Sequence, residues 1–202
     1  MNRRRIEQQM LDRFAGGLVE FLAKHNVSPM ALTLSAFALA LAASITYFFA
    51  FIKPLLYILA GILLIISSFF DAIDGAVARR LGKASDLGAF IDSTMDKLGE
   101  SAVLIAVTAS GAVDPLWGAL ALAFSIMVSY VRHRAEPLGV SLKGVGFMER
   151  AERLILLVAA TFLEPFLHGA LQAAIILIAV FAAFTVTYRI VFTVRRLIHR
   201  LS

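Results

Sequence analysis

The sequence contains no cysteine in 202 residues. Disulfide bonds and thiolate chemistry are therefore excluded, and cysteine usage gives no indication of the redox compartment. Charged residues are also scarce, at 16% of the chain, whereas hydrophobic residues make up 60%. Because soluble domains of this size are about 45–50% apolar, the composition indicates an integral membrane protein.

Several signals of processing or of multiple domains are also missing. The first residues, MNRRRIEQQMLDRF, lack the apolar region and the small-residue cleavage site of a signal peptide. We find no internal repeat, no low-complexity tract and no linker that would separate two domains. The short alternation of a membrane β-barrel is absent as well. We therefore expect a single membrane domain over residues 1–202.

The chain is basic, with a formal net charge of +5 and a pI of about 9.9. A basic chain can indicate nucleic-acid binding, but no soluble basic domain is present to carry that function. In membrane proteins, lysine and arginine collect in cytoplasmic loops and face anionic lipid headgroups. We therefore expect membrane lipids, and no nucleic acid, as partners.

Apolar stretches of about 18 or more residues recur, and each is long enough to cross a hydrocarbon core roughly 30 Å thick. We predict an all-α integral membrane protein in which six transmembrane helices form a bundle over residues 30–194. Proline and glycine mark the breaks between helices. The predicted spans are 30–51, 54–79, 88–110, 115–136, 149–166 and 170–194.

The N-terminal residues 1–25 have an amphipathic pattern, with apolar side chains at three- to four-residue spacing. This pattern predicts a juxtamembrane helix that lies in the membrane interface. Basic residues gather at both termini and in alternate loops, and the positive-inside rule places that side in the cytoplasm. We therefore predict a multi-pass protein of the cell membrane whose termini and active site are cytoplasmic.

Four aspartates lie where the second predicted span ends and the third begins. Asp71 and Asp74 are three residues apart, and Asp92 and Asp96 are four apart, so each pair shares one helix face. If the two spans are antiparallel neighbours, the four carboxylates converge. Hard cations such as Mg²⁺ bind carboxylate oxygens and substrate phosphate. Two Mg²⁺ ions would neutralise the aspartates and leave coordination positions open for a diphosphate.

Other residues of this hairpin fit a phosphate site. Arg79 can pair with phosphate oxygens in bidentate fashion. The small residues Gly75, Ala78 and Gly88 allow helices and ligand to approach closely. Asp86 has no place in the aspartate spacing, and we expect it to be solvated.

These residues together resemble the signature of a known family, the CDP-alcohol phosphatidyltransferases: Asp71-x-x-Asp74-Gly75-x-x-Ala78-Arg79, eight residues, Gly88-x-x-x-Asp92-x-x-x-Asp96. The resemblance implies that a phosphoalcohol moves from a CDP-alcohol, usually CDP-diacylglycerol, to an acceptor hydroxyl, with release of CMP. It also implies two Mg²⁺ ions, for which Mn²⁺ can substitute, and a homodimer.

The resemblance further implies roles for individual residues. Asp71, Asp74 and Asp92 would bind one metal ion, and Asp71, Asp92 and Asp96 a second. Asp96 would also act as general base, because an alcohol is a poor nucleophile until its proton is removed. The CDP-lipid would be contacted by Gly75, Arg79 and Ser85, and by the segment Met30, Ala31, Leu32 and Thr33.

Arginines near the ends of the last three predicted spans bear on the acceptor. Arg189 falls at membrane depth, where an arginine needs a partner. We expect Arg132, Arg153 and Arg189 to meet beside Asp96 and to bind a dianionic phosphate. Their segments resemble one branch of the family, the phosphatidylinositol-phosphate and archaetidylinositol-phosphate synthases. That resemblance implies inositol 1-phosphate as acceptor and adds Ser129 to the pocket.

Other interpretations stay open at this point. The same chemistry can use glycerol 3-phosphate or another polar alcohol, and the donor can carry diacyl or archaeal ether chains. A membrane prenyltransferase also uses aspartates and Mg²⁺, but its motifs normally occur on two helix pairs. A divalent-cation transporter would need polar residues through the bilayer depth, which the first and third predicted spans lack.

Overall fold

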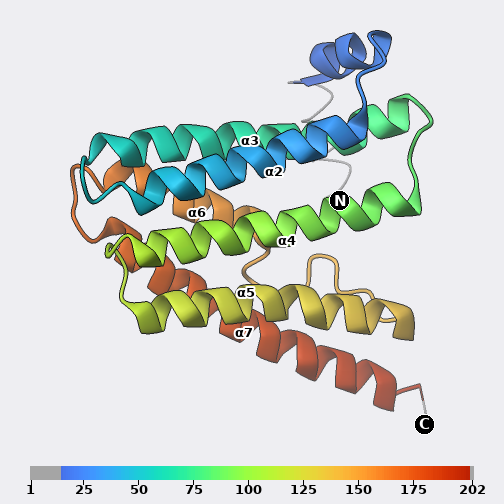
Figure 1. Ribbon diagram of the computed structural model, residues 1–202. Helices are drawn as coiled ribbons and strands as arrows, with labels where there is room; N and C mark the ends of the chain where they lie inside the picture. Colours follow the sequence, from blue (N-terminus) through green and yellow to red (C-terminus); the bar gives the residue numbers. More distant parts are fainter. Residues whose placement is uncertain (1–14, 201–202) are drawn as a thin grey trace. The chain divides into compact units, whose positions relative to one another are not determined.

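The computed structural model describes residues 15–200, and secondary structure in that range is helical, with no strand. A helix at residues 15–24 comes first, and the others follow in chain order (Figure 1). They are α2 (Pro29–Phe48), α3 (Leu55–Arg80), α4 (Asp86–Ala109), α5 (Pro115–Ala135), the 3₁₀ turn η1 (Glu136–Leu138), α6 (Arg150–Leu163) and α7 (Ala170–Ile198). The prediction of an all-α protein is confirmed for the described residues.

Each predicted span coincides with one of the helices α2 to α7, and the largest difference is at the end of α7, which extends to Ile198. Four segments are long and apolar enough to cross a membrane: Pro29–Phe48, Leu55–Arg80, Pro115–Leu138 and Ala170–Ile198. The acidic residues of α4 interrupt its apolar face, and α6 has 14 residues. The count of six spans therefore stays a prediction.

The predicted interfacial helix is described in part. Residues 15–24 are helical, and Leu18 and Phe21 on this helix are exposed. Residues 1–14 of the amphipathic stretch lie outside the described residues. The location of this helix at the membrane interface stays a prediction.

Polar groups set the ends of several helices. After α3, Gly82 adopts a φ of +64°, a left-handed conformation that glycine accepts without strain, and the Lys83 amide donates to the Ala78 carbonyl. At the start of α5, the Asp114 carboxylate accepts from the Leu116 amide, and proline occupies the first helical turn. These capping interactions explain why α3 ends just before the predicted glycine and α5 begins at the predicted proline.

An acidic side chain also bonds to the backbone at the start of α7. The buried Glu164 carboxylate accepts hydrogen bonds from the backbone amides of Gly169 at 3.0 Å and Leu171 at 2.7 Å. Negative charge is favourable at a helix N-terminus because the first amides have no partner within the helix. Glu164 therefore has a structural role.

The chain divides into two compact units. The first contains the described residues up to Ile45 together with Leu59–Val103, which includes most of α2, α3 and α4. Within it, the Ser67 hydroxyl of α3 donates to the Ala36 carbonyl of α2 at 2.7 Å. A Cβ added at Gly99 of α4 would lie 3.2 Å from the Ala40 Cβ of α2. Small residues thus allow the three helices to pack closely.

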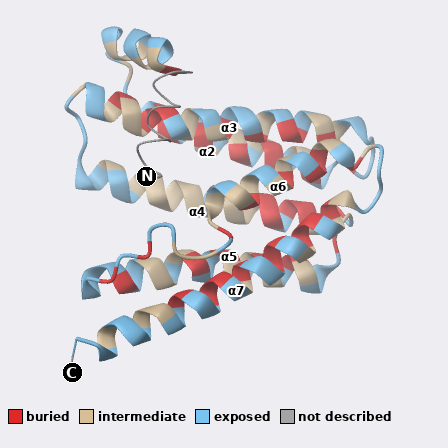
Figure 2. Ribbon diagram, turned by 180° about the vertical axis from the view of Figure 1, so that it is seen from behind, coloured by how far each residue is buried: buried red, intermediate tan, exposed pale blue. Residues whose placement is uncertain are grey.

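The second unit contains Thr46–Ile58 and the chain from Leu104 onward, including α5, α6 and α7. Here α7 packs along α5 and α6, with Val128, Ala182 and Val186 in one buried cluster. The buried residues of α7 lie between Leu171 and Arg189, whereas its last turns are more exposed (Figure 2). The single domain over 1–202 remains a prediction.

Candidate functional site

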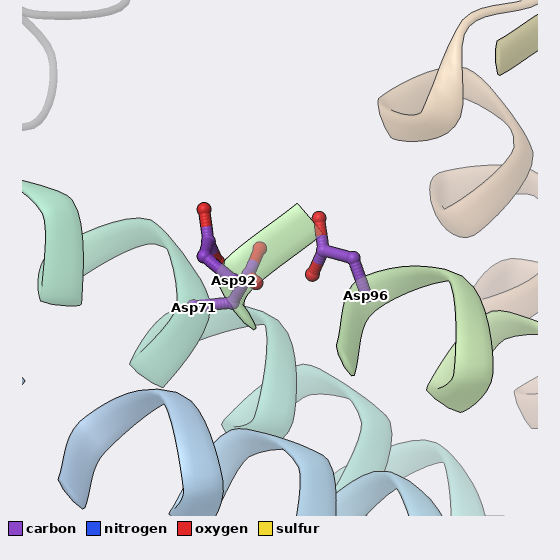
Figure 3. A group of neighbouring side chains, drawn as sticks. All are labelled: Asp71, Asp92 and Asp96. Atoms are coloured by element: carbon purple, nitrogen blue, oxygen red, sulfur yellow. The ribbon is translucent and has the colours of Figure 1, made fainter. Parts of the chain in front are cut away.

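Three of the four predicted aspartates come together in the first unit. Asp71 projects from α3, and Asp92 and Asp96 project from α4 (Figure 3). One carboxylate oxygen from each residue lies within 4.8 Å of those of the other two. All three side chains are partly exposed. The three- and four-residue spacings therefore generate a compact acidic cluster from two helices.

Asp74 lies outside this group of three. It is buried, with 4% of its surface exposed, and its Oδ2 accepts a hydrogen bond of 2.5 Å from the Thr33 hydroxyl of α2. The Thr33 hydroxyl also lies 3.2 Å from the Pro29 carbonyl in its own helix. A buried carboxylate needs such a donor, because burial without a hydrogen bond is costly. Thr33 therefore orients Asp74.

The acidic cluster has the chemistry of a site for a hard divalent cation. Three carboxylate oxygens at this separation can converge on one ion, and Mg²⁺ and Mn²⁺ favour oxygen ligands. The partial exposure of the three side chains would leave coordination positions for substrate oxygens. The donor set of this site thus fits a catalytic metal, and carboxylates this close would repel one another without a cation or protons.

A cavity of about 390 Å³ adjoins the cluster, since Asp92 contributes to both. Asp74 lines the cavity as well, whereas Arg79 and Lys83 supply positive charge to it. The full lining is Ser28, Pro29, Met30, Thr33, Asp74, Gly75, Ala78, Arg79, Lys83, Ala84, Ser85, Gly88, Ala89 and Asp92. A site with both signs of charge suits a ligand that carries phosphates, which cations bind directly and carboxylates bind through a metal.

Most of the residues predicted to contact the CDP-lipid lie around this cavity. Gly75, Arg79, Ser85, Met30 and Thr33 all line it. Ala31 is exposed and Leu32 is buried, and neither is among the lining residues. Their predicted contact with the CDP-lipid stays a prediction without support from this geometry.

Sequence reasoning missed two polar residues of the cavity, Ser28 and Lys83. The Lys83 ammonium donates to the Asn26 side-chain oxygen at 3.2 Å, 57 residues away in sequence. A basic residue four positions after Arg79 in a phosphate-binding hairpin was a signal that could have identified Lys83. Asn26 gave no comparable signal, because its partner is distant in the chain.

The predicted acceptor residues lie in the second unit. Arg189 of α7 is 1% exposed, and Arg153 of α6 is 3% exposed. Arg132 of α5 is partly exposed, and its Nε donates to Glu136 at 2.9 Å. Arg189 donates to the Val128 carbonyl, one turn before Arg132 on α5, and to Glu149, one turn before Arg153 at the start of α6. The structure therefore brings the three arginines into one region, and Ser129 follows Val128, which Arg189 contacts.

Protein groups accept three hydrogen bonds from the Arg189 guanidinium. Its Nε donates to the Val145 carbonyl at 2.7 Å and one terminal nitrogen to the Val128 carbonyl at 2.8 Å. The other terminal nitrogen donates to Glu149 at 2.9 Å. The sequence predicted that an arginine at this depth needs a partner, and Glu149 is one. Phosphate binding by Arg189 stays a prediction.

Comparison with known proteins identifies the family. Residues 26–194 match the model of the CDP-alcohol phosphatidyltransferases. The chain belongs to this family. The match includes the aspartate cluster and every residue of the cavity. The protein is therefore a phosphatidyltransferase, which decides against a cation transporter and against a prenyltransferase.

This chain resembles two archaeal proteins over most of their length. An archaetidylinositol phosphate synthase of Methanothermobacter thermautotrophicus is 38% identical over 95% of this chain and 98% of the relative. A protein of the same name from Pyrococcus horikoshii is 36% identical, over 87% of this chain and 88% of the relative.

A solved structure of a bacterial family member is also similar. The phosphatidylinositol phosphate synthase of Mycobacterium tuberculosis, crystallised with CDP-DAG bound, superposes with a TM-score of 0.78 at 26% identity. The match covers 90% of this chain and 94% of that chain. The same protein has also been crystallised in complex with manganese and citrate.

Proposed function

We propose that this phosphatidyltransferase moves a phosphatidyl or archaetidyl group from a CDP-linked lipid to a hydroxyl of inositol 1-phosphate and releases CMP. The observation that carries the proposal is the acidic cluster of Asp71, Asp92 and Asp96 beside a cavity that contains Arg79 and Lys83. This arrangement supports the binding of a diphosphate next to a divalent cation. Family membership supports a CDP-linked donor.

The metal would be held by the aspartates. We propose two Mg²⁺ ions, with Asp71, Asp74 and Asp92 as ligands of one and Asp71, Asp92 and Asp96 as ligands of the other; Mn²⁺ can substitute. When bound, the ions supply positive charge that stabilises the diphosphate and the leaving CMP. The crystallisation of a similar synthase in complex with manganese supports the binding of a divalent metal.

The chain's own residues would position the donor and move one proton. Arg79 and Lys83 bind phosphate oxygens, and Gly75 and Ser85 leave room for the nucleotide part. Asp96 removes the proton of the acceptor hydroxyl. That oxygen then forms a bond to the lipid-side phosphorus, and the bond from this phosphorus to CMP breaks. One proton, one new P–O bond and one broken P–O bond balance the transfer.

Inositol 1-phosphate is proposed as acceptor for two reasons. The names of the similar archaeal and bacterial synthases support an inositol phosphate. In the second unit, Arg189 is bonded to α5 one turn before Arg132 and to the start of α6 one turn before Arg153, which supports binding of an acceptor with its own phosphate. Ser129 would add a hydroxyl to that pocket.

The acceptor is tested by supplying CDP-diacylglycerol or its archaeal ether counterpart to the purified protein with radiolabelled inositol 1-phosphate or glycerol 3-phosphate. We expect label to enter lipid from inositol 1-phosphate. Incorporation from glycerol 3-phosphate alone would contradict the proposed acceptor while preserving the transferase chemistry. Comparison of the two donors reports which lipid chains the protein accepts.

We further propose that all six helices α2 to α7 cross the cell membrane, with both termini and the active site on the cytoplasmic side. The basic ends of α3, α5 and α7 support this orientation under the positive-inside rule. Burial of the charged residues of α4 against protein or substrate would let it cross. The N-terminal helix would lie in the interface, and the protein would form a homodimer.

The hydrogen bond between Thr33 and Asp74 leads to a prediction about metal affinity. Thr33→Val keeps the shape of the side chain but removes the donor to the Asp74 carboxylate. We expect Mn²⁺ binding, measured by electron paramagnetic resonance without substrate, to weaken about tenfold, since hydrogen bonds to charged groups contribute roughly 1.5–3 kcal/mol. Thr33→Ser retains the hydroxyl and serves as control. Equal Mn²⁺ affinity in Thr33→Val and the wild type would show that Thr33 does not orient a metal ligand.

A further inference from the structure

The segment at residues 145–149 leads into α6 and is held by one face of α7. Thr185 of α7 is completely buried, and its Oγ1 accepts hydrogen bonds from the backbone amides of Phe147 and Met148, both at 3.1 Å. The same hydroxyl donates to the Phe181 carbonyl at 2.8 Å. One hydroxyl thus serves two amides that belong to no helix.

Arg189, one turn further along α7, holds both ends of the same segment. Its guanidinium donates to the Val145 carbonyl and to the Glu149 carboxylate. Residues four apart on a helix share a face, so Thr185 and Arg189 form one continuous attachment surface. The segment is therefore fixed at its start, middle and end by two side chains of α7.

The backbone of the segment is shaped to fit Thr185. Gly146 adopts a φ of +118°, which is strained for any residue with a side chain. A Cβ at this position would also overlap the γ-methyl group of Thr185. The close approach of Gly146 to α7 explains how the next two amides reach the Thr185 hydroxyl.

The segment determines where α6 begins and hence where Arg153 lies. Glu149 is the N-cap of α6 and forms a capping box with Glu152. Arg153 follows one turn later and donates to the Met148 carbonyl at 3.3 Å. Met148 therefore links Thr185 to Arg153, because its amide donates to Thr185 and its carbonyl accepts from Arg153.

We propose that Thr185 is a positioning residue for the acceptor phosphate. It acts through the segment 145–149, which holds the Arg153 side chain in position relative to Arg189. This inference rests on the proposed function, in which these arginines bind the acceptor. Loss of the Thr185 hydroxyl leaves two backbone amides without their acceptor, one of them on the buried Met148. The segment then shifts to find other partners, because buried donors do not stay unpaired.

The test compares Thr185→Val, which keeps the shape and removes the hydroxyl, with Thr185→Ser, which retains the hydroxyl. Thr187→Val is the matched control, because the exposed Thr187 hydroxyl bonds to Ala183 within α7. We expect Thr185→Val to raise KM for inositol 1-phosphate about tenfold. This is the effect of losing one hydrogen bond between the displaced Arg153 and the charged acceptor phosphate. KM for the CDP-lipid should change less than about twofold, as should both constants in the other two variants.

Amide hydrogen exchange provides a second readout that needs no acceptor. In Thr185→Val, exchange should accelerate in residues 145–153 and stay unchanged in α2 to α4. Unchanged exchange at Phe147 and Met148, or an equal loss of donor and acceptor affinity, would overturn the inference. A wild type that does not use inositol 1-phosphate overturns the proposed function instead. In that case, KM is measured for the phosphorylated acceptor that it does use, and without one the exchange result decides.

Discussion

Asp96→Asn is expected to lower the turnover number by about 10³-fold or more while leaving CDP-lipid binding largely intact. Asparagine has nearly the same shape but cannot take a proton from the acceptor hydroxyl, and general bases contribute roughly 10²- to 10⁴-fold. The Asp96 carboxylate also belongs to the acidic cluster, so its loss weakens one proposed metal site. Turnover is measured as CMP release, and binding as the change in thermal stability on addition of CDP-lipid.

The control for this variant is Asp86→Asn. Asp86 is exposed at the first residue of α4, the helix that also carries Asp96. Asp86→Asn removes the same charge from the same helix at a position outside the acidic cluster. The turnover number of this variant should stay within about twofold of the wild type. An Asp96→Asn protein that turns over at the wild-type rate would show that Asp96 is not the base.

Arg132→Gln is expected to raise KM for the phosphorylated acceptor about ten- to 100-fold, with little change in KM for the CDP-lipid. A hydrogen bond to a charged group contributes roughly 1.5–3 kcal/mol, which corresponds to this range. Folding should be little affected, because the Arg132 side chain is partly exposed and its bond to Glu136, the C-cap of α5, is a surface pair. Steady-state kinetics with each substrate varied in turn measures both constants.

Arg134→Gln is the matched control, since Arg134 is exposed and lies on the same last turn of α5. It makes the same change in net charge at nearly the same height along α5. If both variants raise the acceptor KM equally, the effect comes from the general positive potential of this surface. That outcome would contradict a specific phosphate contact by Arg132.

The sequence predicted the helices and the acidic cluster because both depend on local spacing. Apolar runs, prolines and glycines determine where helices start and end, and three- or four-residue intervals place aspartates on one face. The hydrogen bond that orients Asp74 was not predicted. Its partner Thr33 lies 41 residues earlier, and a hydrogen bond between distant helices leaves no periodic signal.

The environment of Arg189 was predicted only in part, because its partners are also distant in the sequence. An arginine surrounded by apolar residues needs a partner, but the sequence does not say which group provides it. The Val128 and Val145 carbonyls have no side-chain signature, and Glu149 lies 40 residues away. Thr185 was missed because a threonine within an apolar helix usually bonds to its own helix, as Thr187 does.

The most direct test of the proposed function is a count of both products in one reaction. Purified protein is incubated with CDP-lipid, Mg²⁺ and radiolabelled inositol 1-phosphate, and CMP and labelled lipid are measured together. Transfer to inositol 1-phosphate predicts one CMP for each labelled lipid and no product after chelation of the metal. Release of pyrophosphate, or of CMP without labelled lipid, would contradict it.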